Sequence, residues 1–148
     1  MILVSACLLG ENCKYSGGNN ANKVIIDYLK DKEYVSVCPE VLGGLPTPRA
    51  CSERVGKCVM NKLGEDVSEA FMLGAEKALA IAQKNHCELC ILQVRSPSCG
   101  VGKIYDGTFS GRLIDGNGVC AELLMAHGFK VINSEAFVSA LTNEHLCL

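Results

Sequence analysis

The sequence has few of the features that proteins use to bind membranes or nucleic acids. No apolar run approaches the roughly 18 residues that a bilayer-spanning helix needs. Tryptophan is absent, and there are only four tyrosines and four phenylalanines. The chain has 14 basic and 16 acidic residues, so it carries no excess of positive charge. The chain therefore has no basic strip interleaved with aromatic side chains, the pattern typical of single-strand-binding surfaces. These absences predict no membrane partner and argue against nucleic acid, which leaves a small metabolite as the natural partner.

The first residues of the sequence are expected to be a poor secretory signal. The first ten residues, MILVSACLLG, contain no basic region, and Gly10 and Glu11 end the apolar stretch early. We therefore expect a cytoplasmic protein, in a compartment that keeps thiols reduced. In such a compartment, metal binding, catalysis or burial explains the ten cysteines better than disulfides do.

What the sequence does contain is a regular alternation of strands and helices. Short β-branched runs predict strands, and apolar residues at helical spacing predict helices. The expected strands are 2–5, 34–37, 88–94 and 130–133, and the expected helices are 21–31, 67–84, 118–127 and 135–141. This order predicts βαβ units around a parallel sheet. We expect residues 1–148 to form a single α/β domain, a three-layer sandwich with a mainly parallel, Rossmann-like sheet.

Three connecting segments have distinctive compositions. Residues 38–49 hold three prolines and two glycines, which predicts a rigid loop. A short apolar piece at 57–60 predicts an additional strand or one arm of a hairpin. Residues 106–118 carry four glycines and are expected to form a long surface excursion.

Three of the cysteines lie just beyond predicted strands. Cys7, Cys38 and Cys99 follow the first, second and third strands respectively. Parallel strands place their carboxyl ends at one edge of the sheet, where α/β folds bind their ligands. Three thiolates that converge there predict a soft metal or an iron–sulfur cluster. With three protein ligands, one metal position stays open for chemistry.

Polar residues accompany these thiols in a way that indicates an active site. Glu40 lies two residues after Cys38, beside the proline-rich loop. Ser96 and Ser98 precede Cys99, which is followed by glycine. Acid–base and hydrogen-bonding side chains next to candidate metal ligands are the arrangement expected of a catalytic centre.

Four other cysteines are expected to be structural. Cys87 and Cys90 form a C-x-x-C pair, but this pair follows a helix and enters a strand, whereas redox pairs open a helix. Cys58 lies in the apolar piece at 57–60, and Cys120 lies on an apolar helix. Both are therefore predicted to be core residues, because a free cysteine packs like a small hydrophobic side chain.

Three sequence motifs surround the candidate thiols. They are SACLLG at 5–10, CPEV at 38–41 followed by GGLPTPR at 43–49, and SPSCG at 96–100. In this order they resemble the motifs of the bacterial thiouracil desulfurase family, formerly a domain of unknown function. The resemblance covers nearly the whole chain, because members of that family are single domains of about this length.

Membership of that family would imply a 4Fe-4S cluster and a thiolated pyrimidine as the substrate. By motif, the cluster ligands correspond to Cys7, Cys38 and Cys99, and the catalytic residues to Glu40 and Ser96. The implied reaction is a non-redox desulfuration of thiolated pyrimidines such as 2-thiouracil, in which the open cluster iron takes the substrate sulfur. Hydrolysis of this kind needs no net electron transfer.

The neighbouring side chains are assigned more detailed roles as hypotheses. Glu40 is predicted to take a proton from water and return it to the leaving sulfur. Ser96 is expected to contact the substrate or orient Glu40, and Arg49 and Ser98 are candidate substrate-binding residues. The chain departs from the family pattern at 50–52, where Ala-Cys-Ser replaces a proline-containing segment, so the pocket wall is not predicted.

The same residues allow other functions. A non-catalytic zinc–thiolate protein would use the three thiols with Cys13 or Cys51 as a fourth tetrahedral ligand. A desulfurase of thiolated bases in tRNA would need an RNA-binding surface, which the acidic balance does not favour. A nucleotide- or phosphate-binding module would use Gly17 and Gly18 or the loop 106–118, but neither matches a P-loop or a dinucleotide motif.

Overall fold

A parallel sheet of four strands forms the centre of the fold. The structure, a computed structural model, describes residues 1–146, so Cys147 lies outside the described residues. The strands are β1 (Ile2–Ser5), β2 (Tyr34–Val37), β5 (Leu89–Leu92) and β8 (Val131–Asn133). They pair in the order β2–β1–β5–β8 and every pair is parallel, which confirms the predicted α/β architecture.

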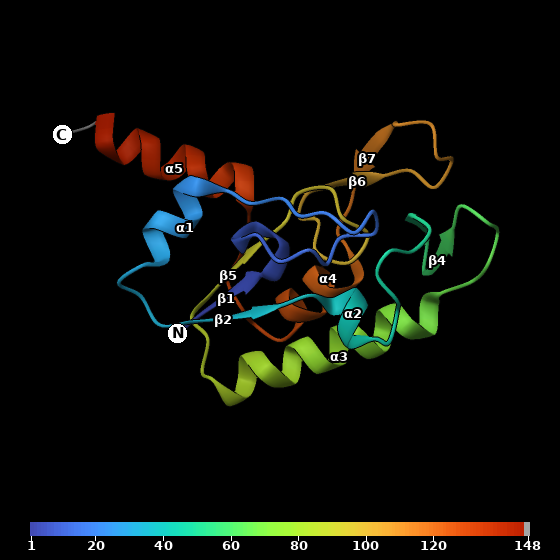
Figure 1. Cartoon of the computed structure of the whole chain (residues 1–148), viewed down its shortest axis with the longest axis horizontal. Helices are drawn as coiled ribbons and strands as arrows, with labels where there is room; N and C mark the ends of the chain where they lie inside the picture. The colour runs from blue at the N-terminus through green and yellow to red at the C-terminus, as the bar shows by residue number, and fades with distance from the viewer. Residues whose placement is uncertain (147–148) are drawn as a thin grey trace.

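Helices cover both faces of the sheet and complete three layers (Figure 1). One face carries α3 (Ser68–Lys84) and α4 (Val119–Ala126), and the other carries α1 (Lys23–Leu29) and α5 (Ser134–Leu146). In β1, Leu3 joins the apolar cluster of the first face, whereas Ile2 and Val4 join that of the second. Neighbouring residues of a strand point to opposite faces, so an apolar strand needs cover on both sides. Among the helices of residues 1–146, none is both long and apolar enough to cross a membrane.

Two β-hairpins extend from this sandwich at the end away from the N terminus (Figure 1). The first joins β3 (Ser52–Val55) to β4 (Cys58–Asn61), and the second joins β6 (Lys103–Tyr105) to β7 (Leu113–Asp115). The first hairpin confirms the arm predicted at 57–60. The second shows that the predicted excursion at 106–118 is partly a strand, because β7 lies within it.

The proline-rich segment 38–49 was predicted to be a loop, but it begins with one helical turn, α2 (Pro39–Leu42). Cys38 has an extended backbone, and Pro39 takes the first helical position, where a backbone N–H is not needed. Helix α2 packs on α3 with direct backbone contact, since a β-carbon at Gly74 would lie 1.8 Å from the Pro39 carbonyl oxygen. Only glycine at position 74 lets the two backbones approach this closely. This contact fixes the position of the turn that carries Cys38 and Glu40.

Two further predictions are corrected by the structure. Cys58 is exposed rather than buried, because it alternates along β4 with Val59, which takes the buried side of the hairpin. The last helix, α5, runs to Leu146 and so extends beyond the predicted end at 141. The other three cysteines predicted to be structural are buried, as expected: Cys87, Cys90 and Cys120.

Candidate active site

A cavity of about 470 Å³ lies at the edge of the sheet where the strands end. Its walls come from the segments that follow β1, β2 and β5 and from the two hairpins. Parallel α/β sheets bind ligands at this edge, because the loops after several strands meet there. The cavity therefore occupies the place where the sequence predicts an active site.

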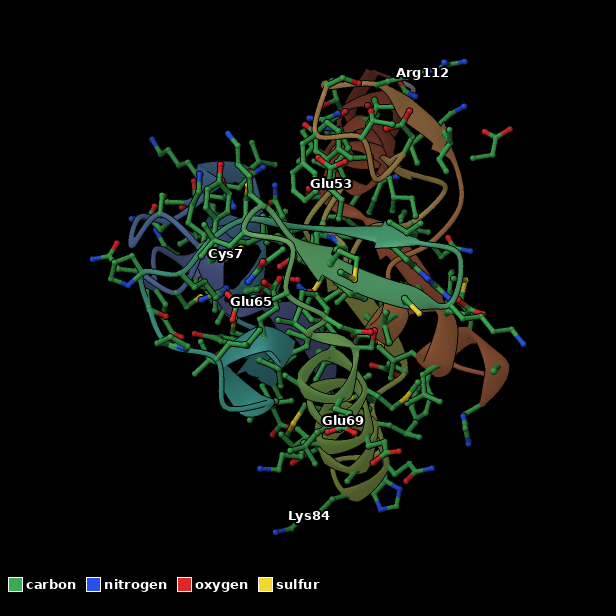
Figure 2. The ribbon with its side chains drawn as sticks, turned by 90° about the vertical axis from the view of Figure 1, so that its right-hand side faces the viewer. Cys7, Glu53, Glu65, Glu69, Lys84 and Arg112 are labelled. Carbon is green, nitrogen blue, oxygen red and sulfur yellow. The ribbon has the colours of Figure 1, made fainter. Side chains whose placement is uncertain are left out.

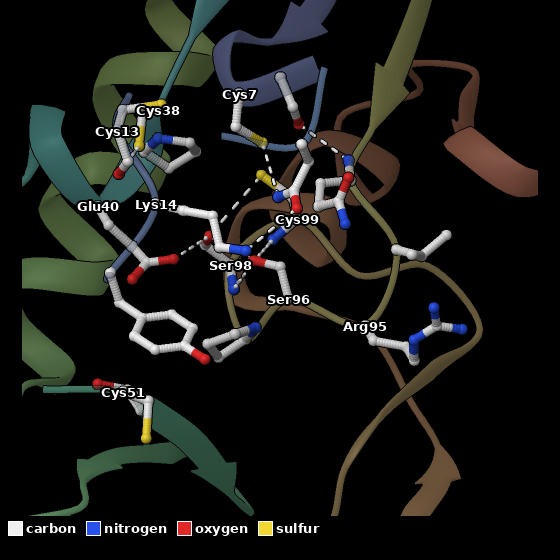
Figure 3. A pocket seen from close by; sticks show the side chains of 18 of the residues that line it. Cys7, Cys13, Lys14, Cys38, Glu40, Cys51, Arg95, Ser96, Ser98 and Cys99 are labelled. Atoms are coloured by element: carbon white, nitrogen blue, oxygen red, sulfur yellow. Dashed lines mark hydrogen bonds between the residues drawn. The ribbon is translucent and has the colours of Figure 1, made fainter. Parts of the chain in front are cut away.

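The three predicted ligand thiols line this cavity (Figure 3). Cys7 lies in a short 3-10 helix, η1 (Ala6–Leu9), directly after β1. Cys38 immediately precedes α2, and Cys99 lies in the loop after β5. All three are free cysteines. The fold thus brings together thiols from three distant parts of the chain.

Burial makes two of these thiols difficult to ionise in the metal-free chain. Cys7 is 9% exposed and Cys99 is 4% exposed. Desolvation raises the pKa of the Cys7 thiol and raises that of Cys99 well above its usual range. A hydrogen bond from Asn20 lowers the pKa of Cys7 and partly offsets its burial. A bound metal would overcome this difficulty, because coordination deprotonates a thiol.

Hydrogen-bond donors lie next to two of the sulfur atoms. The side-chain amide of Asn20 donates to Cys7 Sγ over 3.5 Å. The hydroxyl oxygen of Ser98 lies 3.7 Å from Cys99 Sγ. A donor at such a position stabilises negative charge on sulfur. The Ser98 hydroxyl has one proton, which it can donate either to Cys99 Sγ or to Glu40 Oε2. Asn20 is a site residue that the sequence analysis missed, because it lies in a glycine- and asparagine-rich turn with no other signal.

Glu40 lines the same cavity from α2 and is held by two donors. Arg49 Nε donates to Glu40 Oε1 over 3.2 Å, and Ser98 Oγ donates to Glu40 Oε2 over 3.0 Å. The side chain of Glu40 is 14% exposed and that of Arg49 is 6% exposed, so little water reaches this ion pair. Both carboxylate oxygens are therefore fixed in orientation at the cavity wall.

The remaining donors of Arg49 are directed mainly at the protein. Nη1 donates to the carbonyl oxygen of Pro46 and the hydroxyl of Thr47, and Nη2 donates to the carbonyl oxygen of Cys13. Together with the bond to Glu40, these contacts use four of the five guanidinium N–H groups. Arg49 thereby joins the loop after η1 to the segment after α2. It also lines the cavity, and its contact with substrate stays a prediction.

Ser96 and Ser98 have distinct positions in the site. Ser96 Oγ accepts from the backbone N–H groups of Ser98 (3.1 Å) and Cys99 (3.0 Å), which shapes the loop around that thiol. Ser96 Oγ also lies 3.0 Å from Ser98 Oγ. The hydroxyl in direct contact with Glu40 is that of Ser98, and Ser96 reaches the carboxylate only through it. The sequence predicts that both serines lie in the site, but it does not reveal which of them contacts Glu40 directly.

Cys13 and Cys51, whose roles the sequence leaves open, also line the cavity. The carbonyl oxygen of Cys13 lies 3.7 Å from Cys38 Sγ, and burial together with that neighbour raises the pKa of the Cys13 thiol to about 12. Cys51 lies near the β3–β4 hairpin, apart from the other thiols in Figure 3. Among the side chains of residues 1–143, no three His, Cys, Asp or Glu residues are grouped so that they could hold a single metal ion.

Glu53 shapes the cavity, although the sequence analysis missed it. Its side chain lies on β3 and is largely buried (Figure 2). Oε1 accepts from the backbone N–H groups of Gly107 (2.9 Å) and Phe109 (3.1 Å). These bonds hold the loop between β6 and β7 against the first hairpin, so that Tyr105 and Phe109 line the cavity. Nothing local in the sequence distinguishes this glutamate from a surface residue of a hairpin.

Known proteins are similar to this chain over nearly its whole length. A family model described as 2-thiouracil desulfurase matches residues 2–136. The uncharacterized protein YbbK of Bacillus subtilis (strain 168) is 44% identical over 143 residues, which cover 90% of this chain and 95% of that protein. A solved structure described as the [4Fe-4S]-dependent thiouracil desulfidase TudS has a TM-score of 0.89 and 38% identity, and the match covers 98% of this chain and 97% of that one.

Proposed function

Because this chain belongs to the 2-thiouracil desulfurase family, we propose that it is a [4Fe-4S]-dependent enzyme that removes sulfur from thiolated pyrimidines such as 2-thiouracil. One observation carries the proposal: three free thiols, a fixed carboxylate and a serine hydroxyl meet in one cavity. Cys7, Cys38 and Cys99 are the proposed cluster ligands. Glu40 is the proposed catalytic acid–base.

The donor set fits a group larger than one metal ion. Thiolates are the usual ligands of iron–sulfur clusters, and here three thiols from separate segments surround a shared space of about 470 Å³. A single zinc ion would require each sulfur to lie about 2.3 Å from one point. The side chains of residues 1–143 contain no such group of three ligands. Three thiols that line one cavity are the donor set expected for a cluster of several iron atoms.

Hydrolysis accounts for the whole reaction. When bound, a cluster with three protein thiolates would supply an open iron that acts as a Lewis acid with an affinity for sulfur. The oxygen of water forms a bond to the ring carbon, the carbon–sulfur bond breaks, and the products are the oxo-pyrimidine and hydrogen sulfide. No electrons are gained or lost overall, so neither an oxidant nor a reductant is required.

Glu40 is suited to carry the proton in this hydrolysis. Its carboxylate lines the cavity and can accept a proton from the attacking water and return it to the departing sulfur. The guanidinium of Arg49 balances the carboxylate charge before the proton arrives, and the hydrogen bond from Ser98 sets the direction of the oxygen atoms. A positioned acid–base group of this kind accelerates proton transfer by about 100-fold to 10,000-fold.

The two serines form a short hydroxyl chain behind this carboxylate. Ser98 donates to the ionised Glu40, and its oxygen lies 3.0 Å from Ser96 Oγ. When Glu40 holds a proton, Ser98 can accept from the carboxylic acid and turn its own hydroxyl toward Cys99 Sγ, which lies 3.7 Å away. The chain therefore serves both protonation states of Glu40. Ser96, which also lines the cavity, is the proposed contact to the substrate ring.

Protein purified without oxygen tests the proposal. We expect a brown protein with iron and sulfide in the amounts of one [4Fe-4S] cluster, and release of uracil and sulfide from 2-thiouracil. A protein that stays colourless after anaerobic reconstitution, and particularly one that binds zinc, would instead be a zinc–thiolate protein. Turnover of thiolated tRNA without turnover of free 2-thiouracil would retain the reaction but change the substrate.

A further inference from the structure

Asn20 is attached to Cys7 at two points. Its backbone N–H donates to the Cys7 carbonyl oxygen over 3.0 Å, and its side-chain amide donates to Cys7 Sγ over 3.5 Å. Because both the backbone and the side chain are held, the amide stays directed at the sulfur. The roles proposed above for the hydrolysis do not use this contact.

Lys14 lies on the other side of the same amide. Its Nζ donates to Asn20 Oδ1 over 3.4 Å and lies 6.0 Å from the centre of the Tyr15 ring. Figure 3 shows the Lys14 side chain extending into the cavity between Glu40 and the cysteines. A donor to the oxygen of an amide polarises it and strengthens its N–H groups as donors. The charge of Lys14 therefore acts on Cys7 through Asn20.

The charge of Lys14 differs from those of the two arginines that line the cavity. Both arginines that line the cavity are paired with a carboxylate, Arg49 with Glu40 over 3.2 Å and Arg95 with Glu135 over 2.8 Å. Among the side chains of residues 1–143, no carboxylate forms such a pair with Lys14, whose side chain instead contacts the neutral Asn20 amide. Lys14 thus brings to the cavity a positive charge that no carboxylate there balances.

We propose that Asn20 and Lys14 stabilise the negative charge at Cys7 when the cluster is bound, with Asn20 as a positioning residue and Lys14 as the source of charge. This inference rests on the proposed function. A cluster held by three thiolates is anionic, and hydrogen bonds to its sulfur atoms and nearby charges set its reduction potential. Side chains that support a metal ligand in this way also hold the metal in place.

The test uses anaerobically purified protein with its cluster and measures two properties other than turnover. These are the rate of iron loss to a chelator and the midpoint reduction potential. Asn20→Asp removes the N–H donor and adds a negative charge, so we expect iron loss about 10 times faster or more and a more negative potential. Lys14→Gln should move both properties in the same direction by less. Lys14→Arg keeps the charge and should stay near the wild type.

Two matched variants control for disturbance of the loop and for loss of charge. Asn19→Ala changes the neighbouring exposed asparagine, whose side chain bonds to Asn12 and to the backbone of Ala21 rather than to Cys7. Lys23→Gln removes an exposed charge at the start of α1. Both variants should keep the potential and the iron-loss rate of the wild type.

Three outcomes would overturn the inference. Asn20→Asp with wild-type potential and iron loss would reject it and leave the proposed function intact. An equal change in Asn19→Ala would assign the effect to the loop rather than to the bond with sulfur. A wild-type protein that cannot hold a cluster would reject both the inference and the proposed function.

Discussion

Two cysteines beside the cavity, Cys7 and Cys99, are buried much as the cysteines of the core are, but they differ in their neighbours. Cys7 and Cys99 are almost as inaccessible as Cys90 and Cys120, which are 0% exposed. The two core thiols pack in the apolar cluster beneath α3 and α4, and burial raises both of their pKa values to about 12. Cys99 packs in the same cluster and Cys7 in that of the opposite face, but each also lies next to a polar side chain, the Ser98 hydroxyl and the Asn20 amide respectively. Burial alone therefore does not identify a ligand thiol, whereas polar neighbours do.

Position relative to a strand also separates a core thiol, Cys90, from the cavity thiols. Cys90 lies within β5, which is paired with a strand on each side, whereas Cys7, Cys38 and Cys99 lie beyond the ends of strands. Beyond a strand end the chain leaves the sheet, and its side chains can face the space between the loops. The same residue type is thus structural inside a strand and available for chemistry after it.

Among the variants that test the difference between cavity thiols and core thiols, Cys7→Ser is expected to have the largest effect. Iron–sulfur clusters are held by thiolates, and a serine hydroxyl is a much harder and more weakly acidic donor. We expect loss of the cluster and a fall of desulfuration to the background rate. Iron and sulfide content, the visible spectrum and uracil release measure these effects. Full iron and full activity in this variant would remove Cys7 from the ligand set.

Glu40→Gln should separate chemistry from cluster binding. The amide keeps the size of the side chain but cannot take up a proton, so turnover of 2-thiouracil should fall by about 100-fold or more while the iron content stays unchanged. Glu69→Gln, at an exposed position in the first turn of α3, is the matched control. Loss of the cluster in Glu40→Gln would instead make Glu40 a structural residue of the site.

The central strands and the grouping of the three thiols are predictable from local sequence patterns. Strands β1 and β2 have the predicted bounds, 2–5 and 34–37, because each is a short apolar run that ends in a marked change of composition. The parallel order then places the residues after each strand at one edge. The helical turn at 39–42 escapes prediction because its proline and following glycines are typical of loops, although proline is also favoured at a helix start.

Side-chain partners across the cavity are not predictable in this way. Ser98 contacts Glu40, and Glu53 holds the backbone of Phe109, but in each case the partners are far apart in the sequence. Such contacts depend on how loops pack in three dimensions rather than on spacing. The exposure of Cys58 is unpredictable for a similar reason. Its apolar neighbours in the sequence predict burial, but the hairpin exposes alternate residues, and Cys58 is one of them.

Ser98→Ala tests whether the polar neighbours of the cavity thiols matter for turnover, because it removes one of them. Glu40 Oε2 would lose its donor, and a hydrogen bond to a charged group contributes about 1.5–3 kcal/mol. We therefore expect turnover to fall about 10-fold or more with the iron content retained. Ser139→Ala, on the exposed side of α5, is the control and should behave as the wild type. Unchanged turnover in Ser98→Ala would mean that Glu40 does not depend on this serine.

Cys120→Ser tests whether a core thiol is structural rather than functional. This thiol is fully buried on α4, and a serine there places a hydroxyl among apolar side chains. We expect the free energy of unfolding to fall by about 1–3 kcal/mol, because a buried hydroxyl without a good partner is unfavourable. Urea denaturation measures this change, and the iron content should stay at the wild-type level. Loss of iron without loss of stability would place Cys120 among the functional thiols.

The smallest effect is expected at Cys58, the exposed cysteine of β4. Cys58→Ser should change the free energy of unfolding by less than about 0.5 kcal/mol, because the side chain is replaced at the surface. In the wild-type protein at about pH 8, iodoacetamide should modify Cys58 but leave Cys90 and Cys120 intact, since solvent does not reach these two and their pKa values are about 12. Mass spectrometry of the labelled protein resolves the sites. Early labelling of Cys90 would mean that the core opens in solution, and burial would then no longer distinguish the core thiols from the surface one.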